Sequence, residues 1–376
     1  MTPHSGRVSA AAIRPEPSSG LVAADQAELV LGQSLPLTGP SAQLGLDYQR
    51  GAMAWFEEVN RKGGVHGRHI RLVSLDDQYE PEKTLRNTET LLQRPDLLAL
   101  FGYVGTPTTK VVLPMIEASD VPLIAPMTGA SLLRQPELRM VFNLRASYRK
   151  EIAAMVDELV RDAHHRIAVV YQDDAFGQDG LNGALAALQS HGLKPVATAT
   201  VQRNSNQVSE AVRQLMAAEP NGVIVVSTYV SSAALASALR EKGSWAQIMN
   251  VSFVGTKALQ QAMPAGESNG IGVAQVVPFP WNRWIPVVAD YQRLMRSHAD
   301  DPSFGFTSLE GFLAAKLITE GLERAGANPT RQSLIGALES IRNLDVGGFT
   351  LQMDRSDHQA SDFVELTFLG SQSWEP

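Results

Sequence analysis

Residues 97–130 read LLALFGYVGTPTTKVVLPMIEASDVPLIAPMTGA, and this stretch decides the class of fold. Two apolar runs, 97–104 and 121–125, end in small glycine and hydroxyl residues. Between them, apolar residues repeat at helical spacing: Val111, Val112, Met115 and Ile116. The pattern predicts strand, loop, helix, strand and loop. Ligands of open α/β sheets bind at the carboxyl ends of parallel strands. One such loop is equally well explained as a turn with a helix N-cap, but two in succession favour a binding crevice.

The same alternation of short apolar strands and amphipathic helices extends along most of the chain. One series of β/α units begins at Leu29, and a second begins after about Arg145. Strands that are apolar throughout are typical of parallel sheets covered on both faces. Beyond Pro278 the pattern predicts long helices, followed by two short strands near 349–353 and 363–368. The sequence therefore predicts an α/β fold with two lobes, in which the late helices return to cover the first lobe.

The expected boundaries follow from where the pattern restarts. We assign residues 29–145 and 279–346 to lobe 1, and residues 146–278 and 347–376 to lobe 2. The chain would then cross between the lobes near 144–147, 276–279 and 346–349. Residues 1–28 are rich in Ser, Ala, Pro and Gly, which predicts a disordered arm.

Composition excludes several classes of function. The 376 residues carry a net charge of -7 without a basic cluster, which argues against a nucleic-acid partner. The absence of cysteine excludes disulfides, thiolate catalysis and cysteine-ligated metals. No run approaches the roughly 18 apolar residues needed to span a bilayer. The first 28 residues lack the hydrophobic core of a signal peptide. They suit a processed chain, a misassigned start, a cytoplasmic protein or a tether behind a removed signal or lipid anchor.

No catalytic constellation is evident. Ser147 and Lys150 match a Ser-x-x-Lys pattern, but the accompanying Lys-Thr-Gly and Ser-Asp-Asn elements are absent. His66 and His69 lie in a glycine-rich turn without nearby carboxylates, so a solvated loop is favoured over a metal site. The acidic pairs 76–77 and 173–174 follow strands, where caps of helix N-termini are the usual role. We expect a protein that is not an enzyme and has no catalytic residue, cofactor or metal.

Several longer motifs carry a family resemblance. In chain order they are PLTGPSAQLG at 36–45, EVNRKGGVHGR at 58–68, DDQYEP at 76–81, Gly105-Thr106, DDAFG at 173–177 and SLEG at 308–311. On these residues the chain resembles the type I periplasmic binding proteins, in particular the leucine/isoleucine/valine-binding branch of ABC-transporter substrate-binding proteins. The resemblance extends from Leu29 to about Leu369. It implies two Rossmann-like lobes joined by a three-segment hinge that closes over a ligand.

The resemblance also implies a pocket. The ligand-carboxylate loop of the family falls on Thr106, and Phe176 stands where many members have tyrosine. The acid that meets an amino acid's ammonium group aligns with Ser252, which cannot supply a counter-charge. Leucine, isoleucine and valine are therefore expected to bind poorly. The complete expected ligand-binding set is Leu44, Tyr103, Gly105, Thr106, Met127, Thr128, Gly129, Phe176, Tyr229, Ser252, Phe253, Phe279 and Trp281.

The resemblance implies a solute-binding protein of an ABC importer. Its expected ligand is a small carboxylate, or a neutral molecule, with an apolar or aromatic part. Its expected partner is an ABC-transporter permease, and the protein is expected to be a periplasmic monomer. Two alternatives stay open: a cytoplasmic sensor like the amide-sensing negative regulators, which the absent signal peptide favours, and a carrier of a bulkier lipid-like ligand.

Overall fold

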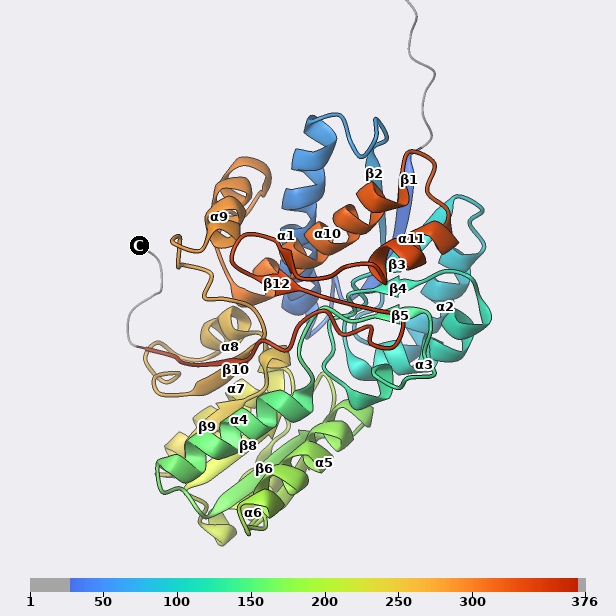
Figure 1. The fold of residues 1–376 in the computed structure, drawn as a ribbon. Helices are drawn as coiled ribbons and strands as arrows, with labels where there is room; N and C mark the ends of the chain where they lie inside the picture. The colour runs from blue at the N-terminus through green and yellow to red at the C-terminus, as the bar shows by residue number, and fades with distance from the viewer. Residues whose placement is uncertain (1–27, 371–376) are drawn as a thin grey trace, which may run out of the picture.

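The structure is a computed structural model that describes residues 28–370. Two sheets, each covered by helices, form two lobes that lie one above the other (Figure 1). The expected disordered arm, apart from Glu28, lies outside the described residues, as do residues 371–376.

The sheet of lobe 1 is wholly parallel, with strand order β2-β1-β3-β4-β5. Its strands are β1 (Leu29–Leu35), β2 (Ile70–Asp76), β3 (Leu97–Phe101), β4 (Leu123–Ile124) and β5 (Val141–Phe142). The three inner strands, β1, β3 and β4, are buried along their whole length. A continuous apolar strand needs cover on both faces, so helices lie on either side of this sheet.

One face of this sheet is covered by helices from both ends of the chain. α1 (Ala42–Arg61) packs there against α9 (Pro286–His298) and α10 (Phe306–Ala325), and α10 packs in turn on α11 (Arg331–Leu338). The late helices thus return to lobe 1. α1 and α10 approach closely because Gly51 and Gly311 lack side chains; a Cβ at Gly311 would lie 2.0 Å from the Tyr48 carbonyl oxygen. The other face carries α2 (Pro81–Leu92) and α3 (Thr106–Ala118).

The sheet of lobe 2 has the order β13-β10-β9-β8-β6-β7, and only β13 is antiparallel to its neighbour. Its strands are β6 (Ile167–Gln172), β7 (Thr198–Val201), β8 (Gly222–Val226), β9 (Gln247–Asn250), β10 (Gly272–Gln275) and β13 (Glu365–Phe368). One face is covered by α4 (Tyr148–Arg161) and α5 (Ala175–Ser190). The other carries α6 (Ser209–Ala218), α7 (Tyr229–Glu241) and α8 (Thr256–Ala262).

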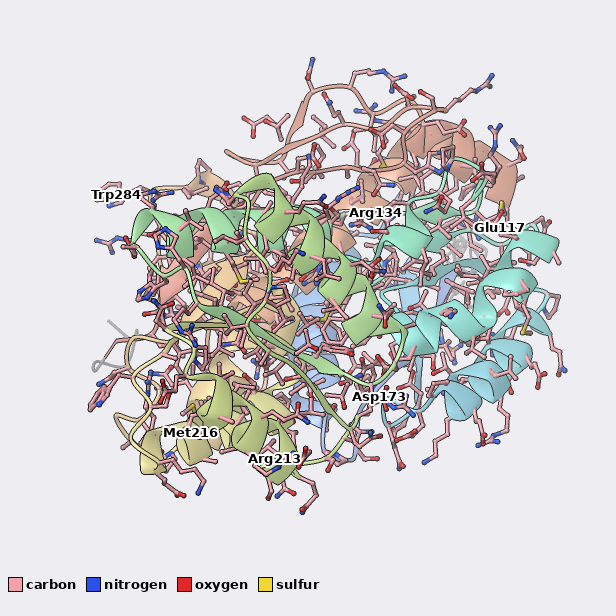
Figure 2. All side chains as sticks on the ribbon, turned by 90° about the horizontal axis from the view of Figure 1, so that it is seen from below. Glu117, Arg134, Asp173, Arg213, Met216 and Trp284 are labelled. Carbon is pink, nitrogen blue, oxygen red and sulfur yellow. The ribbon has the colours of Figure 1, made fainter. Side chains whose placement is uncertain are left out.

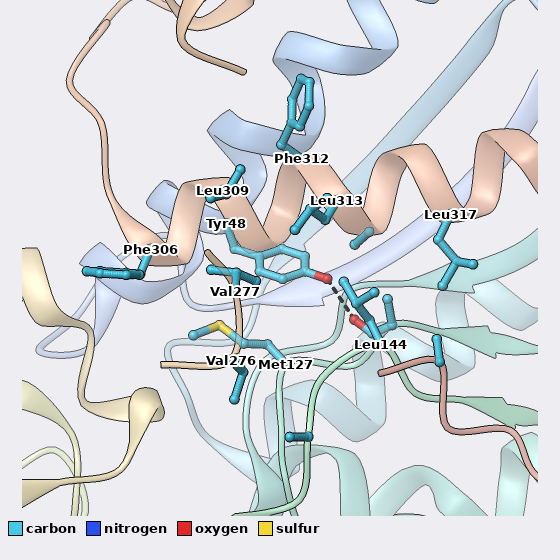
Figure 3. Packing of buried hydrophobic residues seen from close by; sticks show 14 of the residues in the cluster. Tyr48, Met127, Leu144, Val276, Val277, Phe306, Leu309, Phe312, Leu313 and Leu317 are labelled. Atoms are coloured by element: carbon cyan, nitrogen blue, oxygen red, sulfur yellow. Dashed lines mark hydrogen bonds between the residues drawn. The ribbon is translucent and has the colours of Figure 1, made fainter. Parts of the chain in front are cut away.

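The first two crossings between the lobes pass through the centre of the molecule. Leu144 follows β5, Val276 and Val277 follow β10, and all three are buried beside Tyr48 of α1 and Leu309 of α10 (Figure 3). The Tyr48 hydroxyl donates a hydrogen bond of 2.7 Å to the carbonyl oxygen of Ala125. The connecting segments are therefore packed into the core rather than exposed.

The expected position of the third crossing is wrong. The chain was expected to cross near 346–349, with residues 347–376 in lobe 2. Instead β11 (Leu344–Asp345) pairs with β12 (Thr350–Leu351) as a local hairpin. Gln359 still bridges Asn143, next to β5, and the His358 ring stacks on Phe142. The chain joins the sheet of lobe 2 only at β13, so the third crossing lies between 359 and 365.

Candidate functional site

The site lies where the carboxyl ends of strands from both sheets face one another. In lobe 1 the loops after β3 and β4 are tied together by the hydroxyls of Thr106 and Thr128, 2.7 Å apart. The Gly105 amide also donates a 3.2 Å hydrogen bond to the Met127 carbonyl. Gly105 has φ +99, and a Cβ there would lie 2.2 Å from a ring carbon of Tyr79. Glycine is thus required both for the turn and for the approach of Tyr79.

Four aromatic rings join the lobes beside this loop. Tyr79 of lobe 1 lies 5.8 Å from Phe253 of lobe 2, measured between ring centroids. Phe253 lies 5.0 Å from Phe176, which lies 5.1 Å from Tyr148. All four side chains are completely buried. Tilted and edge-on ring pairs at such distances are favourable beyond their buried area.

Together these residues form a closed ring of contacts, which we call the interlobe ring: Gly105, Thr106, Thr128, Gly129, Tyr148, Phe176, Phe253 and Tyr79. Gly129 completes it, because its carbonyl accepts a 2.9 Å hydrogen bond from the Tyr148 amide. Burial raises the pKa of Tyr148 to about 12, against the opposing effects of Arg145 and Thr128. Its hydroxyl has no hydrogen bond of acceptable geometry within residues 28–370, and neither has the buried Thr228 hydroxyl.

A buried carboxylate lies next to the ring. Glu151, on the first turn of α4, accepts hydrogen bonds from Ser252, 2.7 Å from the amide and 3.0 Å from the hydroxyl. Ser252 begins η2 (Ser252–Val254), the short helix that also carries Phe253. Burial raises the pKa of Glu151 to about 7, although Arg145 and Ser252 oppose the shift. The position that was expected to lack an acid therefore has one, supplied by a different helix.

Arg145 anchors this region to lobe 1. It lies at the first crossing and makes a bidentate ion pair with Glu310 of α10, at 2.8 and 2.7 Å. Both side chains are buried. Burial opposes the charge of Arg145, but the Glu310 carboxylate holds its pKa above the usual value. Because removal of either partner would leave a buried charge unpaired, this pair fixes the crossing against α10.

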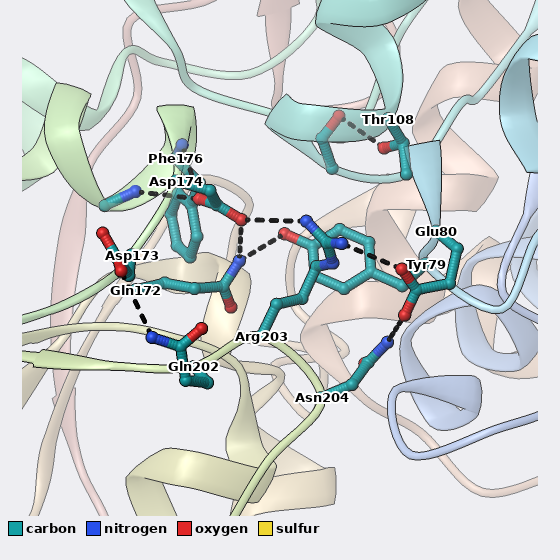
Figure 4. Close-up of polar contacts among 12 residues, drawn as sticks. Tyr79, Glu80, Thr108, Gln172, Asp173, Asp174, Phe176, Gln202, Arg203 and Asn204 are labelled. Carbon is teal, nitrogen blue, oxygen red and sulfur yellow. Dashed lines mark hydrogen bonds and ion pairs between the residues drawn. The ribbon is translucent and has the colours of Figure 1, made fainter. Parts of the chain in front are cut away.

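The lobes also meet at the mouth of the site through polar groups, which we call the latch: Ser41, Gln78 and Glu80 from lobe 1, and Arg203 and Asn204 from lobe 2. Arg203 pairs with Glu80 at 2.8 Å. The side-chain amide of Asn204 donates hydrogen bonds of 2.8 Å to the Glu80 carboxylate and 3.1 Å to the Gln78 carbonyl. The side-chain oxygen of Asn204 accepts a 2.7 Å hydrogen bond from the Ser41 hydroxyl. Figure 4 shows Arg203 and Asn204 reaching across to Glu80 beside the ring of Tyr79. The lobes are therefore closed on one another.

Several expected site residues take other positions. Leu44 packs against Gly255, just after η2, and Tyr229 donates a hydrogen bond to the Pro40 carbonyl, so both lie at the mouth. Phe279 and Trp281 pack together, 5.2 Å apart, and each also packs on Phe306 after the second crossing.

The Tyr103 side chain lies away from the interlobe ring. Its hydroxyl lies 3.0 Å from that of Thr88, and its ring is buried among the residues under α2 and α3. Phe101, two residues earlier, belongs to the core cluster on the other face of the sheet, so regular alternation does not explain this; Gly102, with φ +59, interrupts the extended strand and turns Tyr103 to the outer face.

Sequence reasoning missed Tyr79, Tyr148 and Glu151. Tyr79 is part of the DDQYEP motif, but nothing in the motif indicates the direction of its side chain. Tyr148 and Glu151 are three residues apart on α4, and residues at that spacing share one helix face, which was the available signal.

The motifs interpreted as non-catalytic have structural partners. Ser147 caps α4 by accepting a 3.3 Å hydrogen bond from the Lys150 amide, and the Lys150 side chain pairs with Asp362. Asp174 caps α5, accepting from the Phe176 amide at 2.9 Å. Within residues 28–370 no cluster of His, Asp or Glu is arranged to hold a metal ion. In the same range, no helix combines the length and apolarity needed to cross a membrane.

An open cavity of about 440 Å³ lies elsewhere, at the amino-terminal end of the strands of lobe 1, where Leu29, Arg68 and Arg331 line it. No member of the interlobe ring lines this cavity.

Comparison with known proteins identifies relatives of this architecture. A family model described as periplasmic binding protein matches residues 28–367. A possible leucine/isoleucine/valine-binding protein from Rhodopirellula baltica SH 1 is 34% identical, with a TM-score of 0.89 over 93% of this chain and 96% of that chain. A substrate-binding periplasmic protein from Ralstonia solanacearum is also 34% identical, with a TM-score of 0.87 over 92% and 98%. Leu/Ile/Val-binding protein homolog 7 of Brucella abortus is 24% identical, over 89% of this chain and 88% of its own length. The expected resemblance and the expected fold are confirmed.

Proposed function

Because this chain belongs to the periplasmic binding protein family, we propose that it is the solute-binding protein of an ABC importer. Its two lobes close by hinge bending over a small organic ligand and present it to the permease. Relatives of the chain are solute-binding proteins. The protein would accordingly be a carrier and not an enzyme.

The observation that carries the proposal is the interlobe ring, to which both lobes contribute completely buried side chains. A site divided between two lobes is solvent-accessible only when they separate, so a ligand enters the open form and is enclosed by closure. Hinge closure of this kind is a general way in which two-lobed proteins couple binding to a change of shape.

The ring favours a ligand with one polar and one apolar end. Thr106 and Thr128 place hydroxyl groups at the N-terminus of α3, where the helix dipole favours a carboxylate or another electron-rich group. Tyr79, Phe176 and Phe253 offer aromatic surface to an apolar or aromatic part. The proposed ligand is therefore a small carboxylate, or a neutral molecule, with an apolar portion.

Family membership indicates a periplasmic or extracellular location. Within that range we propose the periplasm, with the ABC permease as protein partner and the chain acting as a monomer.

A metabolite screen tests the proposal. The natively purified protein is analysed for co-purified small molecules by mass spectrometry, and a metabolite library is screened by thermal shift. A ligand present at a hundredfold excess over its dissociation constant stabilises the protein by about 2.7 kcal/mol. A screen in which no small organic molecule stabilises the protein contradicts the proposal.

Thr106→Val then tests the location of the site. Loss of a hydroxyl that binds a charged or polar ligand group costs about 1–3 kcal/mol, which weakens affinity roughly fivefold to 150-fold. The matched control is Thr90→Val, because the Thr90 hydroxyl bonds only to the Arg86 carbonyl of its own helix. Equal affinities for the two variants, measured by calorimetry, would exclude Thr106 from the site.

A further inference from the structure

Glu151 is a completely buried carboxyl group without an ion-pair partner among the described residues. Both of its oxygens are held by Ser252, through one amide and one hydroxyl. Arg145 is the strongest positive influence on it; two of the guanidinium nitrogens bond to Glu310, and the third, Nη1, has no hydrogen-bond partner among the described residues. Burying an ionised carboxylate without a cation beside it costs free energy. Such a group is therefore either protonated or paired with a positive charge that a ligand supplies.

The position of Glu151 connects it to the proposed ligand site. Phe253 directly follows Ser252 and contacts both Phe176 and, across the lobes, Tyr79. Tyr148 lies one turn before Glu151 on the same face of α4 and also contacts Phe176. The Glu151 carboxyl group is therefore hydrogen-bonded, through Ser252, to the segment of lobe 2 that contacts lobe 1.

The charged groups around Glu151 leave its ionisation finely balanced. Arg145 comes from the first crossing and Glu310 from α10. Arg134, which follows η1 (Ser131–Leu133), also interacts with Glu151, and its guanidinium donates a 2.6 Å hydrogen bond to the Arg145 carbonyl. The remaining neighbours, Tyr148 on its own helix and Ser252 on η2, are neutral. Arg134 also interacts with Asp179, so the two cations face Glu310 and Asp179 as well as Glu151, and the Glu151 proton changes the net charge of the group by one.

We propose that Glu151 is a specificity-determining residue that sets which charge the ligand must carry beside Ser252. The inference rests on the proposed function, because it assigns a ligand preference to the same site. With Glu151 ionised, the site favours a zwitterion whose ammonium group supplies the missing cation. With Glu151 protonated, it favours the corresponding keto acid or a neutral molecule.

Proton balance makes the preference depend on pH. A zwitterion that binds the protonated form displaces the Glu151 proton to solvent, whereas a keto acid leaves the proton in place. Burial raises the pKa of this carboxyl to about 7, so the exchange falls within an accessible pH range. Amino-acid affinity is expected to rise with pH, and keto-acid affinity to fall.

Two ligand pairs provide the test: L-leucine with 4-methyl-2-oxopentanoate, and L-phenylalanine with phenylpyruvate. Calorimetry at pH 5.5 and 8.5, in buffers of different ionisation enthalpy, gives both affinity and proton release. In the natural protein, the affinity ratio of amino acid to keto acid is expected to rise by up to about a thousandfold across this interval, because the ionised and protonated fractions of Glu151 each change by about thirtyfold, in opposite directions. Glu151→Gln is expected to bind with a ratio that does not change with pH.

Two variants separate this role from a structural one. Glu158→Gln changes a partly exposed acid about two turns further along the same helix, which pairs with Arg161, and it should behave like the natural protein. Ser252→Ala retains Glu151 but removes the hydroxyl that stabilises its anion, so the pH midpoint of the preference should move upward. Ser252→Ala also keeps the test decisive if Glu151→Gln does not fold.

A ratio that is independent of pH in the natural protein overturns the inference, and so does an unchanged pH dependence in Glu151→Gln. Failure of all four compounds to bind at either pH overturns it as well. The proposed function fails separately, when the metabolite screen finds no small organic ligand at all.

Discussion

At the scale of single residues, Glu151 couples stability to pH. Its pKa is raised from 4.5 to about 7, so the folded protein holds this proton more tightly than the unfolded chain does. The resulting stabilisation is complete below pH 4.5 and is lost as the pH rises through 7. A shift of this size corresponds to about 3 kcal/mol. Denaturant unfolding of the natural protein and Glu151→Gln should show their stability difference changing by about that amount between pH 4.5 and 8.

The comparison between the two proteins isolates this carboxyl. Burial also raises the pKa of Asp77, to about 6, but Asp77 is present in both proteins and its contribution cancels. A stability difference that stays constant with pH would show that Glu151 titrates normally in the folded state.

Local pattern indicates the position of a residue that directly follows a buried strand. Thr106, Thr128 and Gly129 follow buried strands, so the ends of those strands place them at the interlobe ring. Glu151 could not be found in this way, because it meets Ser252 across 101 positions of sequence and on a different element. The sequence also did not show that the Tyr103 side chain turns away from the interlobe ring, because this depends on the positive φ of Gly102 between β3 and Tyr103.

At the scale of elements, the latch connects the loop before α2 with the loop after β7. Arg203 and Glu80 are partly exposed, with side-chain exposures of 26% and 38%, so their pair contributes at most about 1 kcal/mol. Arg203→Ala is expected to raise the ligand dissociation rate up to about fivefold, because the contact exists only in the closed form. The rate is measured by stopped-flow dilution of the labelled complex.

Arg213→Ala is the matched control, since Arg213 pairs with Glu210 inside α6 and makes no contact between lobes. If the two arginine variants release ligand at the same rate, the latch does not hold the closed form.

The error at the third crossing belongs to the same scale. Residues near 349–353 have the alternation of a strand, and the sequence does not tell which strand they join. In the structure, β12 pairs with the neighbouring strand β11 in a short hairpin. The chain therefore remains beside lobe 1 until after Gln359. Pairing partners depend on tertiary contacts that a local pattern does not contain.

At the scale of the whole molecule, the two-lobed architecture could be predicted because it follows from the order of helices and strands along the chain. Two series of β/α units, then helices without strands, indicate two sheets with a return to the first. Closure could not be predicted in this way, because it depends on contacts such as those of the latch and the interlobe ring. α6, marked by Arg213 and Met216, lies towards the outer end of lobe 2 (Figure 2), and it should move relative to lobe 1 when the lobes separate.

The distance between α2 and α6 tests hinge closure most directly. The chain has no cysteine, so Arg86→Cys and Ala217→Cys, both at exposed positions, allow selective spin labelling of the two lobes. Electron–electron double resonance is recorded with and without a ligand verified by calorimetry. The account predicts a longer, broader distance distribution in the free protein and a shorter, narrower one with ligand, at the separation of the closed structure. Identical distributions with and without the verified ligand would contradict closure over a ligand between the lobes.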